Sequence, residues 1–291
     1  MGITEDVEFI NPGDGATALG VGAVAVLLLL SGAAVTVARG DPVVWKLLGI
    51  SWVAFLAMAG SVPFGARAAD DPHPRTLVWG YGLASGAMIT SAALFLLPQA
   101  IGLDPKIGGI GVALGLLTGF GVHTIGHRLT HADLPFDHTA VEIAAHAFAA
   151  GTIIGLIYGT MPSLGPLLGL AIVSHKGPAG YAAARRFRRI DKPLAILLVP
   201  AAGLGIAAIP VGLVGLPPIA PLDALVFGFA AGIFLHVAMD FLPSCEVGSD
   251  VYEVVSPDEH EHHVLDELRI HAVASTVVGG AVVVLAWLVI G

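Results

Sequence analysis

Residues 138–159 read HTAVEIAAHAFAAGTIIGLIYG, and residues 167–183 read LLGLAIVSHKGPAGYAA. Both stretches are mostly apolar and close to the length of about 20 residues that a transmembrane helix needs. They nevertheless carry ionisable side chains, which are His138, Glu142 and His146 in the first and His175 and Lys176 in the second. An ionisable group at the bilayer centre costs at least roughly 2.5–3.5 kcal/mol on insertion scales, so such groups usually indicate an ion or substrate path.

The composition of the whole chain is that of a membrane protein. Of its 291 residues, 56% are hydrophobic and 12% are charged, whereas a soluble domain has about 25% charged residues. The 38 Gly and 19 Pro suit a tightly packed transmembrane bundle. The single Cys245 excludes an intramolecular disulfide and a multi-cysteine metal site. With a net charge of −9 and no basic patch beyond one arginine-rich loop, we expect no nucleic-acid partner.

Apolar windows of about 20 residues predict an all-α polytopic membrane protein with nine spans. The spans are expected near 17–38, 43–66, 76–98, 106–127, 138–158, 163–187, 193–215, 221–244 and 268–290. Because no long linker divides the chain, the spans are expected to form one membrane domain, preceded by an N-terminal segment over residues 1–16.

The basic residues of the short loops predict the orientation of the spans in a cell membrane. Residues 184–192 read ARRFRRIDK, which makes this loop cytoplasmic. Alternation then places the loops with Arg67, Arg128 and Arg269 on the same side. The N-terminus is therefore predicted to be cytoplasmic and the C-terminus extracellular.

The spacing of His138 and Glu142 is typical of a metal site on one helix. Residues four apart lie on one helical face about 6 Å apart along the axis. Imidazole and carboxylate together suit Zn²⁺, Fe²⁺ or Mn²⁺. His146 continues the face one turn further, so it is expected to form a separate stage rather than to share the same ion. The alternative is a set of polar residues that pack between helices.

His175 dominates the following span, where Lys176 is its neighbour and Pro178 interrupts the helical hydrogen bonds. Irregular backbone at membrane depth usually faces a cavity or other protein. Lys176 either faces this site or extends its long side chain to the membrane surface.

Further ligand-type residues lie outside these two spans. His236 and Asp240 are four apart in another span and either line the inner half of the path or form an internal pair. Two histidine clusters, His123, His127 and His131 and then His260, His262 and His263, are expected on the cytoplasmic side, where they could receive or sense metal. Sequence motifs of hydrolases, metalloproteases and nucleotide-binding proteins are missing, so we expect no enzymatic activity.

These residues resemble the motifs of the ZIP (Zrt/Irt-like) family of divalent metal transporters. The family's H-N-x-x-[ED] element is similar to residues 138–142, HTAVE, and its H-E-x-P-[EH] element is similar to residues 175–179, HKGPA. FLLPQ at 95–99, GIFL at 232–235 and DFLP at 240–243 resemble three further elements. The resemblance implies an eight-helix transport domain over residues 43–291, with the 17–38 helix as an N-terminal addition.

The resemblance also implies metal entry to the cytoplasm by an elevator-like movement. The family's two-metal centre is degenerate here, because Thr139, Lys176 and Ala179 stand where the family has metal ligands. The surviving ligands would be His138, Glu142 and His175.

We therefore expect inward transport of a divalent metal ion, with zinc as the first candidate and iron, manganese or cadmium as others. The expected metal residues are His138, Glu142, His175, His146, Asp240 and His236, with Lys176 as a modulating charge. A homodimer is a plausible assembly by family likeness. The alternatives are a membrane-embedded metalloenzyme, with Glu142 or Asp240 as base, and a metal sensor that does not transport.

Overall fold

The computed structural model describes residues 12–70, 73–129, 138–163, 165–166, 169, 175–214, 217, 219–243 and 261–290. Every regular element within these ranges is helical. The α-helices are α1 (Pro12–Val37), α2 (Pro42–Asp70), α3 (Pro74–Ser91), α4 (Leu97–Leu103), α5 (Pro105–Leu129), α6 (His138–Thr160), α8 (Lys176–Arg189), α9 (Leu198–Val214), α10 (Ala220–Asp240) and α11 (Glu261–Ile290). A π-helical turn, η1 (Ala92–Leu96), joins α3 to α4, and a 3-10 turn, η2 (Leu194–Leu197), leads into α9.

Eight helical segments of the described residues are long and apolar enough to cross a membrane. They coincide with eight of the nine predicted spans, which confirms an all-α, multi-span membrane protein. The predicted span at 163–187 lies partly outside the described residues. Its described helix, α8, has 14 residues, and at 1.5 Å per residue it is shorter than the roughly 30 Å hydrocarbon core.

Asp-Pro pairs fix the starts of two of the spanning helices. A side-chain oxygen of Asp41 accepts a hydrogen bond from the Val43 N–H at 2.8 Å. Asp104 accepts hydrogen bonds from the N–H groups of Lys106 and Ile107, both at 3.0 Å. Because the first N–H groups of a helix have no partner within it, these carboxylates satisfy them. The proline that follows each Asp removes no hydrogen bond from the helix, because the N–H of the first helical residue has no partner within the helix.

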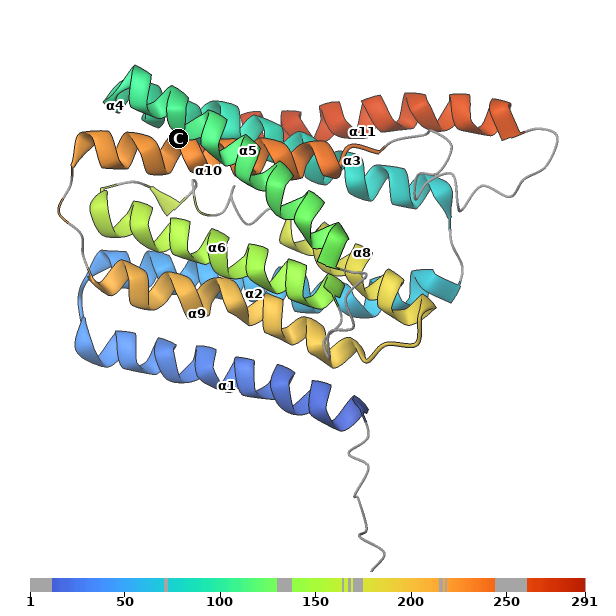
Figure 1. Ribbon diagram of the computed structural model, residues 1–291, viewed down its shortest axis with the longest axis horizontal. Helices are drawn as coiled ribbons and strands as arrows, with labels where there is room; N and C mark the ends of the chain where they lie inside the picture. Colours follow the sequence, from blue (N-terminus) through green and yellow to red (C-terminus); the bar gives the residue numbers. More distant parts are fainter. Residues whose placement is uncertain are drawn as a thin grey trace, which may run out of the picture.

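The helices form two bundles that lie side by side (Figure 1). The first, here called bundle A, contains α1, α2, α6, α8 and α9, and the second, bundle B, contains α3, α4, α5, α10 and α11. Within bundle A, α9 packs against α6, α2 and α1, while α8 packs against α2. Within bundle B, α10 packs against α5, and α11 packs against α3. The main contact between the bundles runs from α6 to α10.

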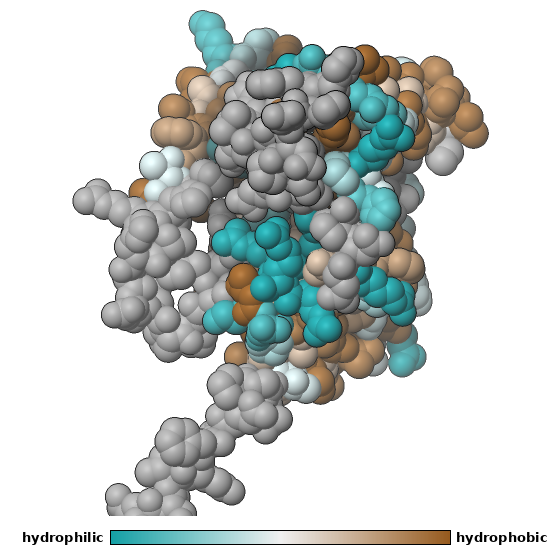
Figure 2. Space-filling view, turned by 90° about the vertical axis from the view of Figure 1, so that its right-hand side faces the viewer, coloured by the Kyte–Doolittle hydropathy of each residue, from teal (hydrophilic) through white to brown (hydrophobic). Residues whose placement is uncertain are grey.

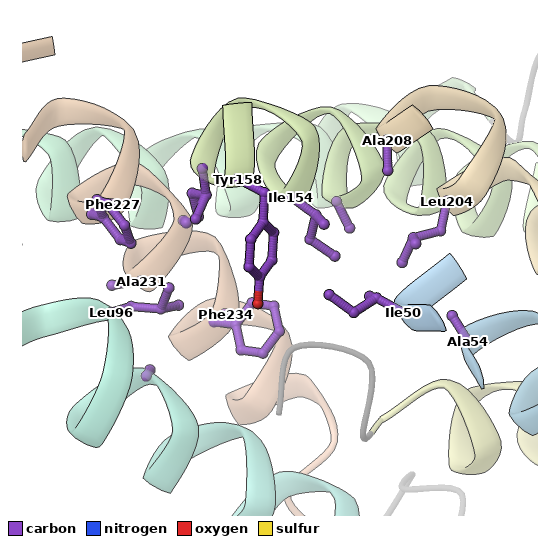
Figure 3. Close-up of a cluster of buried hydrophobic side chains, with 14 of the residues drawn as sticks. Ile50, Ala54, Leu96, Ile154, Tyr158, Leu204, Ala208, Phe227, Ala231 and Phe234 are labelled. Atoms are coloured by element: carbon purple, nitrogen blue, oxygen red, sulfur yellow. The ribbon is translucent and has the colours of Figure 1, made fainter. Parts of the chain in front are cut away.

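Side chains from both bundles meet in one apolar core (Figure 3). Ile154 and Tyr158 of α6 lie among Leu96 of η1 and Phe227 and Phe234 of α10. All five belong to the same buried cluster. The outer faces of α1, α5 and α11 carry exposed Leu, Val, Ile and Phe side chains, as expected of lipid-facing helices.

Hydrophilic residues gather at one end of the molecule (Figure 2). Helix α8 ends there with exposed Arg186, Arg188 and Arg189. The start of α3 is tied to the start of α11 by an ion pair between Arg75 and Glu267 at 2.5 Å. We call this the basic end. It is where α1 begins, whereas α11 ends at the opposite end (Figure 1).

Candidate intramembrane histidine site

The candidate site lies where α8 begins. His175 is the residue that precedes the helix, and Lys176 is its first residue. Both are almost fully buried, with 1% and 2% of their surfaces exposed. Helix formation starts here because Pro178, in the first turn, is tolerated only where the missing N–H is not needed. The first backbone hydrogen bond of the turn runs from the Ala179 N–H to the His175 carbonyl, at 2.9 Å.

His146 of α6 meets His175 across bundle A. Their Nε2 atoms are 3.4 Å apart, and the rings pack edge to face with centroids 5.5 Å apart. One ring N–H can donate a long hydrogen bond to the other ring at this distance. Zn–N bonds of about 2.0–2.1 Å at the tetrahedral angle also place two ligand nitrogens about 3.3–3.4 Å apart. The pair therefore has the spacing of two imidazole ligands on one metal ion.

Bundle B closes the site from the other side. The Phe234 ring of α10 packs edge to face on His175, with centroids 5.5 Å apart. His236, two residues further, packs its ring against Gly119 of α5, where any side chain would collide with it. The His236 Nε2 lies 3.3 Å from an Asp240 carboxylate oxygen. Lys176 and His236 both lie close enough to His146 to interact with it electrostatically.

Tyr158 of α6 binds the backbone of two glycines that lie between α6 and His175 in the sequence. Its side chain is completely buried. The hydroxyl donates a hydrogen bond to the Gly165 carbonyl at 2.8 Å and accepts one from the Gly169 N–H at 3.0 Å. A phenol at this depth needs such partners, because a buried polar group without one is costly. The sequence signal was a Tyr among apolar residues near the end of its span.

Some of the site residues predicted from the sequence lie close together in the structure, and others lie outside its described side chains. The structure brings His146, His175 and Lys176 together and places His236 with Asp240 nearby on α10. His146, which was expected to form a separate stage, contacts His175, and its separation from an ion at His138 and Glu142 stays a prediction. The side chains of His138 and Glu142 lie outside the described part of the chain, so the predicted ligand set stays a prediction. Within the described residues, no three His, Cys, Asp or Glu side chains are grouped closely enough to hold a metal ion.

The two histidine clusters that were predicted on the cytoplasmic side lie outside the described side chains. They comprise His123, His127, His131, His260, His262 and His263. The sequence reasoning missed Phe234, whose position against His175 depends on how α10 meets α8. The nearby motif GIFL at 232–235 contains it, but the spacing of that motif does not say which ring reaches the histidine.

Comparison with protein-family models and with curated proteins finds no match to this chain.

Proposed function

We propose that this multi-span membrane protein carries a divalent transition-metal ion across the bilayer toward the cytoplasm, without enzymatic chemistry. The 3.4 Å separation of the His146 and His175 Nε2 atoms is the observation that carries the proposal. Imidazole nitrogens suit Zn²⁺ and Fe²⁺, and Mn²⁺ and Cd²⁺ are further candidate substrates. Two protein nitrogens give a binding strength suited to release, since a transported ion must both enter and leave. Water, or side chains of the 138–142 segment, would complete the coordination.

The position of the pair between two bundles suggests how the ion moves. His146 and His175 both belong to bundle A, whereas Phe234 and His236 belong to bundle B. The two bundles share an apolar contact between α6 and α10, which includes Ile154, Phe227 and Phe234. Because apolar packing is not directional, such a contact can form again after one bundle has moved along the other. We propose that bundle A carries the ion past bundle B in an elevator-like movement.

The proposal is tested by uptake of radioactive zinc into proteoliposomes that contain the purified protein. Replacing His146 or His175 with Ala removes one of the two nitrogens, and we expect each variant to lose at least about tenfold in uptake. The matched control is His73→Ala, since His73 is exposed before α3. Competition by iron, manganese and cadmium ranks the substrates.

Normal uptake by both histidine variants would contradict the site. Metal binding without uptake by the wild-type protein would instead indicate a sensor.

A further inference from the structure

His271 of α11 takes part in a polar contact between two helices that the proposed metal site does not use. The Nε1–H of Trp79, on α3, donates a hydrogen bond to the His271 Nδ1 at 3.2 Å. The two rings also pack against each other, with centroids 6.2 Å apart. Because an indole nitrogen can only donate, the His271 Nδ1 must accept, and the imidazole must be neutral. This hydrogen bond therefore exists only while His271 carries no extra proton.

Glu267 links the same two helices through an ion pair. Its Oε1 atom lies 2.5 Å from the Arg75 guanidinium of α3 and 3.8 Å from the His271 Nε2 of its own helix. A second proton would make the His271 ring cationic and strengthen its attraction to Glu267. The same carboxylate oxygen would then be shared between His271 and Arg75. Protonation of His271 thus removes one link between α3 and α11 and weakens the other.

Water can supply this proton, because the contact lies at the basic end of the molecule. The His271 side chain is 30% exposed, and the side chains of Glu267 and Arg75 are 53% and 63% exposed. Two further charged side chains of α11, Asp266 and Arg269, pair with each other at 2.6 Å. The charge that answers a proton on His271 is therefore that of Glu267.

The residues beside this contact form an apolar cluster in which a third helix takes part. Tyr181 of α8 packs against the buried side chains of the cluster. These are Leu77 and Val78 of α3 and Leu265, Leu268 and Ala272 of α11. A tyrosine hydroxyl is neutral at acidic and neutral pH, so Tyr181 brings no charge to the contact. The separation of α3 and α11 at this end would change the surface on which α8 packs.

We propose that His271 is a pH-sensitive switch at the basic end, which joins α3 to α11 when it is neutral and releases the start of α3 when it is protonated. The neutral ring holds Trp79 and leaves Glu267 to Arg75. The protonated ring loses Trp79 and draws Glu267 away from Arg75. The apolar contact with Tyr181 loosens in the same step. The switch does not depend on the proposed transport of metal.

The first test follows the indole N–H signals of the full-length protein in detergent, by NMR with ¹⁵N-labelled tryptophan. Trp79→Phe identifies the Trp79 signal among those of the four tryptophans. Histidines change their charge between pH 5 and 8, so we expect this signal to move upfield as the pH falls through that range and the hydrogen bond is lost. In His271→Gln the side-chain carbonyl can accept from Trp79 without titrating, and the signal should stay in place.

The matched control is His73→Gln, which alters an exposed histidine just before α3 and should leave the titration unchanged. If His271→Gln fails to fold, His271→Leu carries the same prediction of a signal that does not titrate. A Trp79 signal that stays constant in the wild type, or that still titrates in the His271 variants, would overturn the proposal.

The second test measures the release itself. Spin labels are attached to Thr76→Cys on α3 and Ile270→Cys on α11, two exposed positions, after Cys245→Ser. We expect a longer and broader distribution of label distances at pH 5 than at pH 8, and no such change when His271→Gln is added. A distribution that is the same at both pH values in the protein with His271 would show that the helices stay joined and would refute the switch.

Discussion

At the scale of single residues, several buried polar side chains of this protein contact one another or bind backbone groups. His175 contacts His146 and Phe234, and Tyr158 uses its hydroxyl both as donor and as acceptor. Within a membrane, water does not readily satisfy such groups, so a partner within the chain stabilises them. The polar side chains of the interior are therefore those whose replacement the fold should tolerate least.

Tyr158→Phe tests this argument away from the histidines. The change keeps the ring but leaves the Gly165 carbonyl and the Gly169 N–H without their shared partner. Each buried group left unsatisfied costs about 1–3 kcal/mol. We expect a loss of stability of that order in denaturant unfolding, and slower metal uptake, because these glycines precede His175 in the chain.

Tyr181→Phe is the matched control, because the Tyr181 hydroxyl makes no hydrogen bond to any described residue. A Tyr158→Phe variant as stable as the wild type would show that the two hydrogen bonds contribute nothing to the fold.

At the scale of the helices, close approach depends on residues without side chains. Gly115 of α5 lies against the backbone of Phe229 and Gly232 of α10, and a Cβ at Gly115 would collide with the Phe229 carbonyl oxygen. Small residues are favoured at such crossings in membranes, because they let two backbones touch. The α5–α10 contact thereby holds His236, which packs against Gly119 one turn further along α5.

The sign of a Gly→Ala change should therefore depend on which face of α5 carries it. At Gly109, an added Cβ meets nothing within 4 Å, so Ala should stabilise the helix by roughly 0.5–1 kcal/mol through its better helix propensity. At Gly115, the same change should destabilise the protein by about 1–3 kcal/mol or more, because backbone atoms must move. Thermal unfolding in detergent compares the two variants directly. Equal effects would show that the α5–α10 crossing is looser than described.

A sequence pattern predicts the positions of the helices better than it predicts the contacts between their side chains. The span at 106–127 was predicted from composition alone, and α5 covers Pro105–Leu129. The π-helical turn at Ala92–Leu96 was not predicted. Pro98, which has no N–H to donate to a carbonyl of the preceding turn, lies two residues after it. Helical periodicity relates His138, Glu142 and His146 to one another, but it does not say which of them faces a neighbouring helix. Which side chains meet depends on how α6 lies against the start of α8, so the His146–His175 contact could not be predicted.

At the scale of the whole molecule, two bundles and one basic end constrain how the protein works. The histidine pair belongs to bundle A, and bundle B covers it with Phe234. Helix α8 runs from the pair to the basic end, where its last turn contains Arg186, Arg188 and Arg189. The transport proposed above has a direction only once the orientation of the protein in the membrane is known.

The basic end should be cytoplasmic, because Lys and Arg in short loops are retained on that side of a membrane. The test introduces single cysteines at Arg188 and at Lys106 after the native Cys245 has been replaced with Ser. Helix α5 begins at the end opposite the basic one (Figure 1), so a membrane-impermeant maleimide should label position 106 in intact cells. Position 188 should react only after the membrane is permeabilised. Labelling of position 188 in intact cells would reverse the orientation, and the inward direction of transport would have to be given up with it.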